Sequence, residues 1–383
     1  MSAEKKTLES RLLRGAHKTL TGLTPALESV LAAIIGLFIG ALVMWLWGYD
    51  PIVAYKAMLL GAFGSKWGLA DAGAIAAPLV LTALSFSICL RAGMFNIGAE
   101  GQLLMAGLAT VCAGFFVLPP ILHHAVAILF AMSAGAIWSM GPALLKLTRG
   151  VHEVISTIMF NWIANFLSLF LIGAFLINDF SADQTIAIPS SAVFSKIMRG
   201  TDLTYAIFVA IAFALIVYFV LWHTAIGYEV RAAGLNPSAA RYGGIRNKRT
   251  LFLAFVLSGV SAGLAATTIL MGSSAIHSMY RAHGQLLHVG FDGMAVAMVG
   301  RNHPIGILFS AMFFGGLSAG GRLMQLSPNP VPVQMVRLVM GVIVFTMAIP
   351  ELVRIFPAIV NGTSGFIDRL RRLVSRTGRR RST

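Results

Sequence analysis

Six amide and carboxylate side chains lie in or beside long apolar runs of this sequence, and they could contact a polar solute. They are Asn96, Glu100, Gln102, Asn161, Asn165 and Asp292. Polar groups at bilayer depth are costly and usually face an interior cavity, which favours a translocation path. The alternative is hydrogen bonding between helices. For the asparagines both interpretations stay open, whereas a path or a gating pair is favoured for the two acids, because a buried acid needs a partner.

Other motifs could indicate catalysis, but their surroundings argue against it. Two Gly-x-Ser-x-Gly strings are centred on Ser261 and Ser318. A nucleophile elbow requires a strand before it and a helix after it, whereas both strings lie inside apolar helical runs. Small residues four apart favour close packing between membrane helices instead. An intramembrane serine hydrolase stays a distant alternative, which would need a base beside the serine.

No nucleotide or metal motif is complete. The sequence has no Gly-Lys dipeptide, so it lacks a Walker A loop, and His152-Glu153 is followed by Ser156 where a zincin has its second histidine. We therefore expect no catalytic residue, no metal site and no cofactor.

The chain that carries the six polar residues consists largely of apolar runs, and the longest of them are about as long as a hydrocarbon core requires. Ser29–Gly48, Leu203–Trp222 and Thr250–Gly272 each hold roughly 20 uncharged residues, and the whole chain is 57% hydrophobic and only 11% charged. In lipid every backbone polar group must be paired internally, so such runs must be helices. The sequence predicts an all-α polytopic membrane protein.

About ten spans are predicted, and they place both termini on one side. We expect a tail at 1–28, a membrane domain at 29–355 and a basic tail at 356–383. Connections 49–71 and 178–202 are predicted to be polar and external, and the loop 223–249 to be internal. The spans are 29–48, 72–90, 95–117, 121–145, 152–177, 203–222, 250–272, 288–299, 304–320 and 333–350.

The formal net charge of +15 is sorted by side rather than gathered into a nucleic-acid surface. About 22 of the 29 Lys and Arg residues fall on one side of this topology, as the positive-inside rule expects. That side is then cytoplasmic and holds both termini. Anionic membrane lipid is the expected partner of the basic tail, and nucleic acid is not.

Two segments, one in each half of the chain, are weakly similar in sequence. Gly93–Gly107 and Gly290–Gly306 are both glycine-rich, apolar and interrupted by one acid, at Glu100 and Asp292. Interrupted segments at matching positions are typical of an inverted repeat.

The loop 223–249 contains a predicted docking helix. Asn236-Pro237-Ser238 is typical of a helix start, Ser238–Tyr242 would form a short helix, and Gly243-Gly244 could end it. Ala239 and Ala240 would keep this helix thin enough to enter a groove. A bulky residue at position 240 is therefore predicted to block docking without unfolding the chain. The alternative is a helix that lies on lipid.

Three segments resemble permeases of ATP-binding-cassette (ABC) importers. The run Gly234, Asn236, Ala239, Ala240, Gly244 and Ile245 resembles their cytoplasmic coupling motif. Leu90–Gln102 resembles the signature of the branch for simple sugars and nucleosides, and Gly290–Ala297 with Gly300-Arg301-Asn302 is similar to the second signature of the nucleoside type. The coupling motif has Ser238 where other branches have a glutamate.

The resemblance implies the following expectations. A second permease subunit, identical or homologous, pairs with this chain. A cytoplasmic ABC ATPase docks on the coupling motif, and a substrate-binding protein docks outside. The location is a bacterial cytoplasmic membrane, and the function is import of nucleosides or related sugar-containing solutes by alternating access. Branched-chain amino acid import is the alternative, since those permeases share the architecture.

Overall fold

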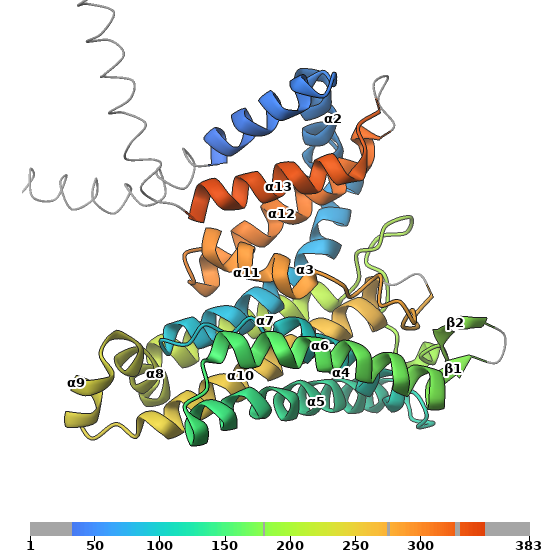
Figure 1. Ribbon diagram of the computed structural model, residues 1–383. Helices are drawn as coiled ribbons and strands as arrows, with labels where there is room; N and C mark the ends of the chain where they lie inside the picture. The colour runs from blue at the N-terminus through green and yellow to red at the C-terminus, as the bar shows by residue number, and fades with distance from the viewer. Residues whose placement is uncertain (1–32, 179–180, 274–275, 326–329, 349–383) are drawn as a thin grey trace, which may run out of the picture. The chain divides into compact units, whose positions relative to one another are not determined.

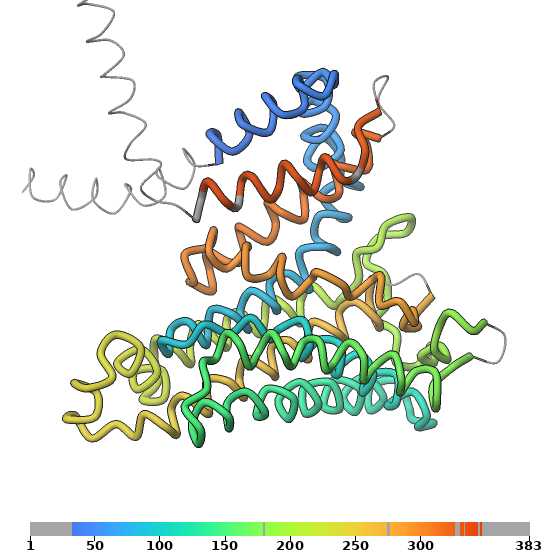
Figure 2. Tube along the Cα trace, in the orientation of Figure 1, coloured from blue at the N-terminus to red at the C-terminus, as the bar shows by residue number. Residues whose placement is uncertain are grey.

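The computed structural model describes residues 33–178, 181–273, 276–325 and 330–348 (Figures 1 and 2). The chain forms two compact units, one of residues 1–51 with 337–383 and one of residues 52–336. The predicted tails, 1–28 and 356–383, lie outside the described residues. So do the beginning of the span 29–48 and the last two residues of the span 333–350.

The described residues are mainly helical, which confirms the predicted all-α class. Six helices are long and apolar enough to cross a membrane, two of them counted with a π-helical extension. Five further apolar helices are shorter than these six. One of them lies in the smaller unit, and the other four lie wholly or partly in the larger unit. How many of these helices cross the bilayer stays a prediction. The long helices are α3 (Lys66–Arg91), α5 (Pro120–Arg149), α6 (Glu153–Leu171), α7 (Ala206–His223), α10 (Asn247–Thr267) and α12 (Pro304–Met324).

Helices α3 and α10 form the centre of the larger unit. Their apolar windows are 89% and 78% buried, whereas those of α5, α6 and α7 are at most 28% buried. Helix α3 contacts α10, α12, α7 and α11 (Val289–Val299), while α4 (Ala99–Ala113) lies against α5, α6 and α10. The polar residues on α4 and α11 that were singled out from the sequence therefore lie next to the two most deeply buried helices, α3 and α10.

Small residues allow α10 to touch α5 at the backbone. A Cβ on Gly259 would lie 2.3 Å from the Gly135 carbonyl oxygen, and one on Gly263 would lie 2.4 Å from that of Ala131. Ser261, between the two glycines, donates to the Leu81 carbonyl oxygen at 2.6 Å. The packing interpretation of this Gly-x-Ser-x-Gly string is confirmed.

The second string has the same role on α12. A Cβ on Gly320 would lie 2.0 Å from the Met58 carbonyl oxygen of α2 (Pro51–Phe63), and one on Gly316 would meet the Phe63 ring at 2.6 Å. Both glycines therefore mark helix crossings rather than a nucleophile elbow.

The predicted polar connection 49–71 is wrong. Residues 51–63 form the helix α2, and α3 begins at Lys66 with Ser65 as its N-cap. Thirteen residues are too few to cross a bilayer, so the segment did not stand out as a span. Its contact with α12 explains why it is helical and apolar nonetheless.

The larger unit has two distinct ends. Helices α8 (Ala225–Leu235) and α9 (Pro237–Tyr242) lie at one end, and a hairpin of β1 (Ile177–Asn178) and β2 (Ser181–Thr185) lies at the other (Figure 1). The predicted internal loop 223–249 and external connection 178–202 are thus at opposite ends. The hairpin itself was not predicted, because its strands are only two and five residues long.

At the hairpin end, main-chain hydrogen bonds join loops from distant parts of the chain into one layer. The π-helices η1 (Ile172–Leu176) and η3 (Thr268–Ser273) continue α6 and α10 into this layer. Main-chain bonds then join distant segments, including Thr185 N–H to the Met279 carbonyl and Phe194 N–H to the Met271 carbonyl. These bonds satisfy backbone groups that no helix pairs.

The smaller unit, as far as it is described, is a helix pair. Helix Ala33–Leu46 packs on the part of α13 (Val333–Ala348) that begins at Arg337. A Cβ on Gly36 would lie only 2.7 Å from the Ile343 Cα atom, so the two helices touch at the backbone. Trp45 and Trp47 are exposed at the end of the first helix, as expected of side chains at a membrane interface.

Candidate translocation and coupling sites

Glu100 holds the beginning of α11. Its carboxylate accepts the backbone N–H of His288, and its Oε2 atom accepts that of Gly290 at 2.8 Å. Only 5% of the side chain is exposed. The first N–H groups of a helix have no partner within the helix and carry partial positive charge, so a carboxylate there stabilises the helix end. Glu100 thereby fixes α11 to α4.

Asn161 of α6 holds the beginning of α4 in the same way. Its Oδ1 atom accepts the Gly101 N–H at 2.8 Å, and its Nδ2 donates to the Ile97 carbonyl at 2.9 Å. A Cβ on Gly101 would lie only 2.9 Å from this Oδ1 atom, so the glycine permits the close approach. The side-chain amide replaces the backbone pairing that is missing where α4 starts.

Asn96 and Gln102 join a buried polar chain between α3 and α10. Asn96 Nδ2 donates to Ser258 Oγ at 2.7 Å, and Ser258 Oγ lies 2.8 Å from Ser85 Oγ. Ser85 in turn donates to Gln102 Oε1 at 3.4 Å. Every member is buried. In a low-dielectric interior such a connected network rigidifies the contact that it spans.

Four of the six predicted residues are therefore brought together, and two are not part of this buried cluster. Asn165 lies one turn beyond Asn161 and is half-buried, while Asp292 lies in the first turn of α11 and is exposed. Glu100 and Asp292 occupy echoing positions in the sequence but unlike environments. The inverted repeat stays a prediction.

The partners Ser85 and Ser258 were missed in the sequence. A serine in an apolar helix is common, because its hydroxyl can also bond the carbonyl one turn earlier. Nothing in the sequence separated these two from the other buried serines. Their role became visible only when α3, α4 and α10 were seen together.

The segment 234–245 forms the short helix that its sequence predicts. Asn236 Oδ1 accepts the N–H groups of Ser238 and Ala239 at 3.1 and 3.0 Å, so it caps α9. Gly244 follows with φ +83°, a conformation that glycine adopts without strain. Leu235 and Tyr242 are 88% and 95% exposed, which leaves large apolar side chains on the surface of this end.

The two alanines of α9 differ in a way that the sequence did not reveal. Ala239 is exposed, whereas Ala240 is 6% exposed and lies against the chain itself. The expectation that a bulky residue at position 240 would spare the fold is therefore wrong, because a tryptophan has no room there.

Gly234 has a packing role that was not predicted. A Cβ on Gly234 would lie 2.2 Å from the Arg91 carbonyl oxygen and 2.8 Å from the Gly93 nitrogen. Gly93 has φ +78° and faces the Gly234 Cα atom in the same way. The segment 234–245 therefore packs closely against the end of α3, where the segment Leu90–Gln102 begins.

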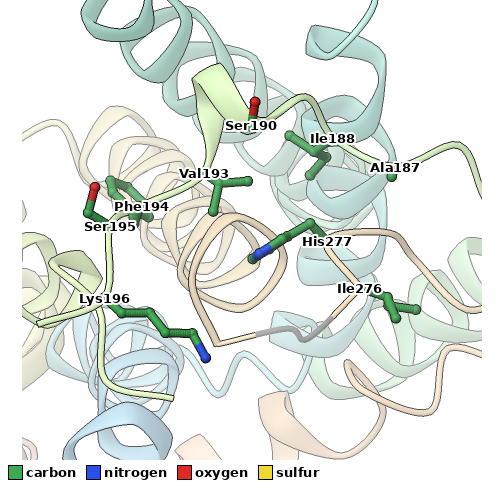
Figure 3. Close-up of a pocket in the computed structure, with 9 residues that line it drawn as sticks. All are labelled: Ala187, Ile188, Ser190, Val193, Phe194, Ser195, Lys196, Ile276 and His277. Carbon is green, nitrogen blue, oxygen red and sulfur yellow. The ribbon is translucent and has the colours of Figure 1, made fainter. Parts of the chain in front are cut away.

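A cavity of about 420 Å³ opens at the hairpin end of the larger unit (Figure 3). Lys196 and His277 point toward it from two segments of the chain, and apolar side chains lie around them. The Nζ atom of Lys196 lies 3.7 Å from the Oδ1 atom of Asp202, so this carboxylate partly balances the positive charge of Lys196. The cavity is lined by Ala187, Ile188, Ser190, Val193, Phe194, Ser195, Lys196, Ile276 and His277.

Within the described residues, no group of three or more His, Cys, Asp or Glu side chains is placed to hold a metal ion. Cys89 is buried, and Cys112 is half-buried on another helix.

Comparison with known proteins finds membrane permeases. Residues 68–348 match the family described as the permease component of a branched-chain amino acid transport system. The nucleoside ABC transporter permease protein NupB of Lactococcus lactis subsp. cremoris is 33% identical over 88% of this chain and 94% of its own length.

Two further relatives cover most of the chain. The guanosine ABC transporter permease protein NupP of Bacillus subtilis is 33% identical over 85% of this chain and 94% of its own length. The glucose ABC transporter permease protein TsgB13 of Haloferax volcanii is 29% identical over 84% and 87%, respectively.

This chain belongs to that family of ABC transporter permeases. It is the transmembrane subunit of an ABC importer, a multi-pass membrane protein that transports and is not itself an enzyme. The family implies a nucleotide-binding ATPase and a substrate-binding protein as partners.

Proposed function

We propose that this permease imports nucleosides. The observation that carries the proposal is the similarity, over nearly the whole chain, to permeases named for nucleosides and guanosine. The glucose permease is the third relative, and a nucleoside contains a sugar ring. Import of branched-chain amino acids, which the family description names, is the second candidate.

The path is proposed to run beside α4, α6 and α11. Asn165 and Asp292 are the members of the predicted set that are not enclosed by the chain, so they are the ones placed to meet solute. Glu100 and Asn161 support the wall behind them by holding the beginnings of α11 and α4. Asn96 and Gln102 support it by joining α3 and α10 through Ser258 and Ser85. Amide and carboxylate groups at this depth suit the hydroxyl groups of a ribose.

The ATPase is proposed to dock on α9 and on the exposed side chains around it. Asn236, Ala239 and Tyr242 are exposed, and the short helix projects from the end of the bundle (Figure 2). Arg241, Arg246, Lys248 and Arg249 are exposed there as well, and by the positive-inside rule they support a cytoplasmic position for this end. The substrate-binding protein and the loops 178–202 and 276–288 would then lie outside.

The pairing of subunits belongs to the same proposal. A second permease subunit, identical or homologous, completes the path, and membrane lipid surrounds the pair. The chain would reside in the cytoplasmic membrane with both termini inside.

Reconstitution tests the proposed solute. The permease would be purified with the ATPase and binding protein encoded beside it and placed in liposomes. We expect ATP-dependent import of radiolabelled guanosine or uridine, competed by other nucleosides and not by leucine. Import of leucine without import of nucleosides would overturn the proposal in favour of the second candidate. The permease alone should hydrolyse no ATP above a lipid blank.

A further inference from the structure

Arg91, the last residue of α3, holds the turn between α11 and α12. Its Nε atom donates to the Asn302 carbonyl oxygen at 3.0 Å, and an η nitrogen donates to the Arg301 carbonyl oxygen at 3.2 Å. Ser87, one turn earlier on α3, donates to the same Asn302 oxygen at 3.0 Å. A planar guanidinium can bind two adjacent carbonyls at once, which a lysine cannot do in the same geometry.

That turn is held in an unfavourable conformation. Arg301 and Asn302 have φ values of 55° and 53°, in the left-handed region that side chains seldom adopt in succession. The Oδ1 atom of Asn302 is buried and has no hydrogen-bond partner among the described residues. Strain and an unsatisfied acceptor together are typical of an element that has a second arrangement available.

Arg91 also connects this turn to the coupling segment through an aromatic ring. Its Cζ atom lies 5.3 Å from the centre of the Trp222 ring, at the end of α7, and that of Arg231 on α8 lies 5.7 Å from the same centre. The His303 ring, beside the turn, is 4.6 Å from Trp222. One ring thus contacts a cation from α3, a cation from α8 and the residue after the turn.

The backbone contact runs in parallel with this cluster. Gly234 of α8 touches the carbonyl of Arg91 itself, so α8 cannot shift toward α3 without moving that residue. At the far end of α11, Glu100 holds the first turn. Helix α11 is therefore fixed at its beginning by α4 and at its end by Arg91.

We propose that Arg91 is a positioning residue that transmits movement of α8 and α9 to α11 through Trp222 and the 301–302 turn. When the ATPase displaces α9, the Gly234 contact and the shared ring move Arg91. The two carbonyl bonds then pull the end of α11. This inference rests on the proposed docking of the ATPase, but it does not depend on which solute is carried.

The test compares Arg91→Gln with the wild type in the complete transporter in liposomes. The variant should bind the ATPase and hydrolyse ATP, yet the solute imported per ATP should fall at least about fivefold, the lower range of a coupling between sites. Arg91→Lys should be intermediate. Arg149→Gln is the control, because Arg149 is an exposed cation at the end of α5, away from the Trp222 cluster.

Hydrogen exchange gives a second measurement that needs no solute. A non-hydrolysable ATP analogue should change amide protection of residues 289–303 in the wild-type complex, and in Arg91→Gln the change should be confined to α8 and α9. A wild-type response in α11, or an unchanged import ratio, would overturn the proposal. Failure of the wild-type complex to import nucleosides would instead contradict the proposed solute, while the exchange result would still decide the role of Arg91.

Loss of assembly in Arg91→Gln is addressed with Trp222→Leu, which leaves both carbonyl bonds in place and removes the ring. If Trp222→Leu assembles and keeps the wild-type import ratio and exchange response, Arg91 only stabilises the fold and the proposal is wrong. If it assembles with a reduced ratio, the transmission through the ring is supported.

Discussion

Two of the buried polar side chains, those of Glu100 and Asn161, bond to the beginnings of helices. Glu100 holds α11 and Asn161 holds α4, each by accepting or donating bonds where the helix has none of its own. These bonds are the interhelical hydrogen bonding that was weighed from the sequence, and the translocation path stays a proposal. They bind helices together, and they line up the two short helices beside the proposed path.

The asparagine pair on α6 separates these functions. Asn161→Ala should lower the free energy of unfolding by about 1–3 kcal/mol, because it leaves the buried Gly101 N–H and Ile97 carbonyl unpaired. Asn165→Ala should leave stability unchanged and reduce nucleoside uptake. Thermal unfolding of the purified permease and uptake in liposomes measure both. Equal stability losses in the two variants would contradict the assignment.

His283 predicts a dependence of stability on pH. Burial lowers the pKa of this imidazole, whose Nε2 atom lies 2.9 Å from Ser168 Oγ. The unfolded chain then binds a proton more readily, so stability is complete above the ordinary pKa of about 6.5 and is lost as pH falls below it. The unfolding midpoint should drop between about pH 7.5 and about pH 5.5, and it should drop less in His283→Gln. An identical drop in both proteins would assign the effect to other groups.

At the scale of elements, α9 is exposed on one face and buried on the other. Its N-cap and its terminal glycine were predictable from sequence, because they follow from local bonds within ten residues. Which alanine faces outward was not predictable, since six residues form too short a helix for an apolar pattern to appear. The face was decided by the packing of α9 on its own chain.

Tryptophan at the two alanines of α9 tests the docking face. Ala239→Trp should leave the permease folded and inserted while it abolishes ATPase binding and uptake, because position 239 is exposed. Ala240→Trp should instead destabilise the chain by about 1–3 kcal/mol through overpacking. Co-purification with the ATPase and thermal unfolding distinguish the two. Full transport by Ala239→Trp would contradict the docking role.

At the scale of the whole molecule, the two ends of the larger unit differ. The end with α8 and α9 is rich in exposed cations, and the end with β1 and β2 consists of loops joined by hydrogen bonds. Ser238, in α9, is exposed at the first end, and Ser190, in the short 3-10 helix Ser190–Ala192, is exposed at the second. By the positive-inside rule, we expect the first end to face the cytoplasm.

Cysteine labelling tests this orientation. Cys89 and Cys112 would be replaced by alanine, and a single cysteine introduced at position 190 or 238. A membrane-impermeant maleimide should label Ser190→Cys in intact cells and Ser238→Cys only after permeabilisation. The opposite pattern would invert the topology.

The sequence by itself determined the class of this protein, the position of nearly every long helix and the capped short helix α9. Each follows from a run of about 20 apolar residues or from a cap within one turn, and both are local properties. Tertiary structure alone decided that α2 is a helix, that Glu100 binds the first backbone N–H groups of α11, and that Arg91 meets Trp222 and the 301–302 turn. Those contacts join residues up to about 200 positions apart, and the pairing of side chains at such separations depends on how the helices pack, which no local pattern records.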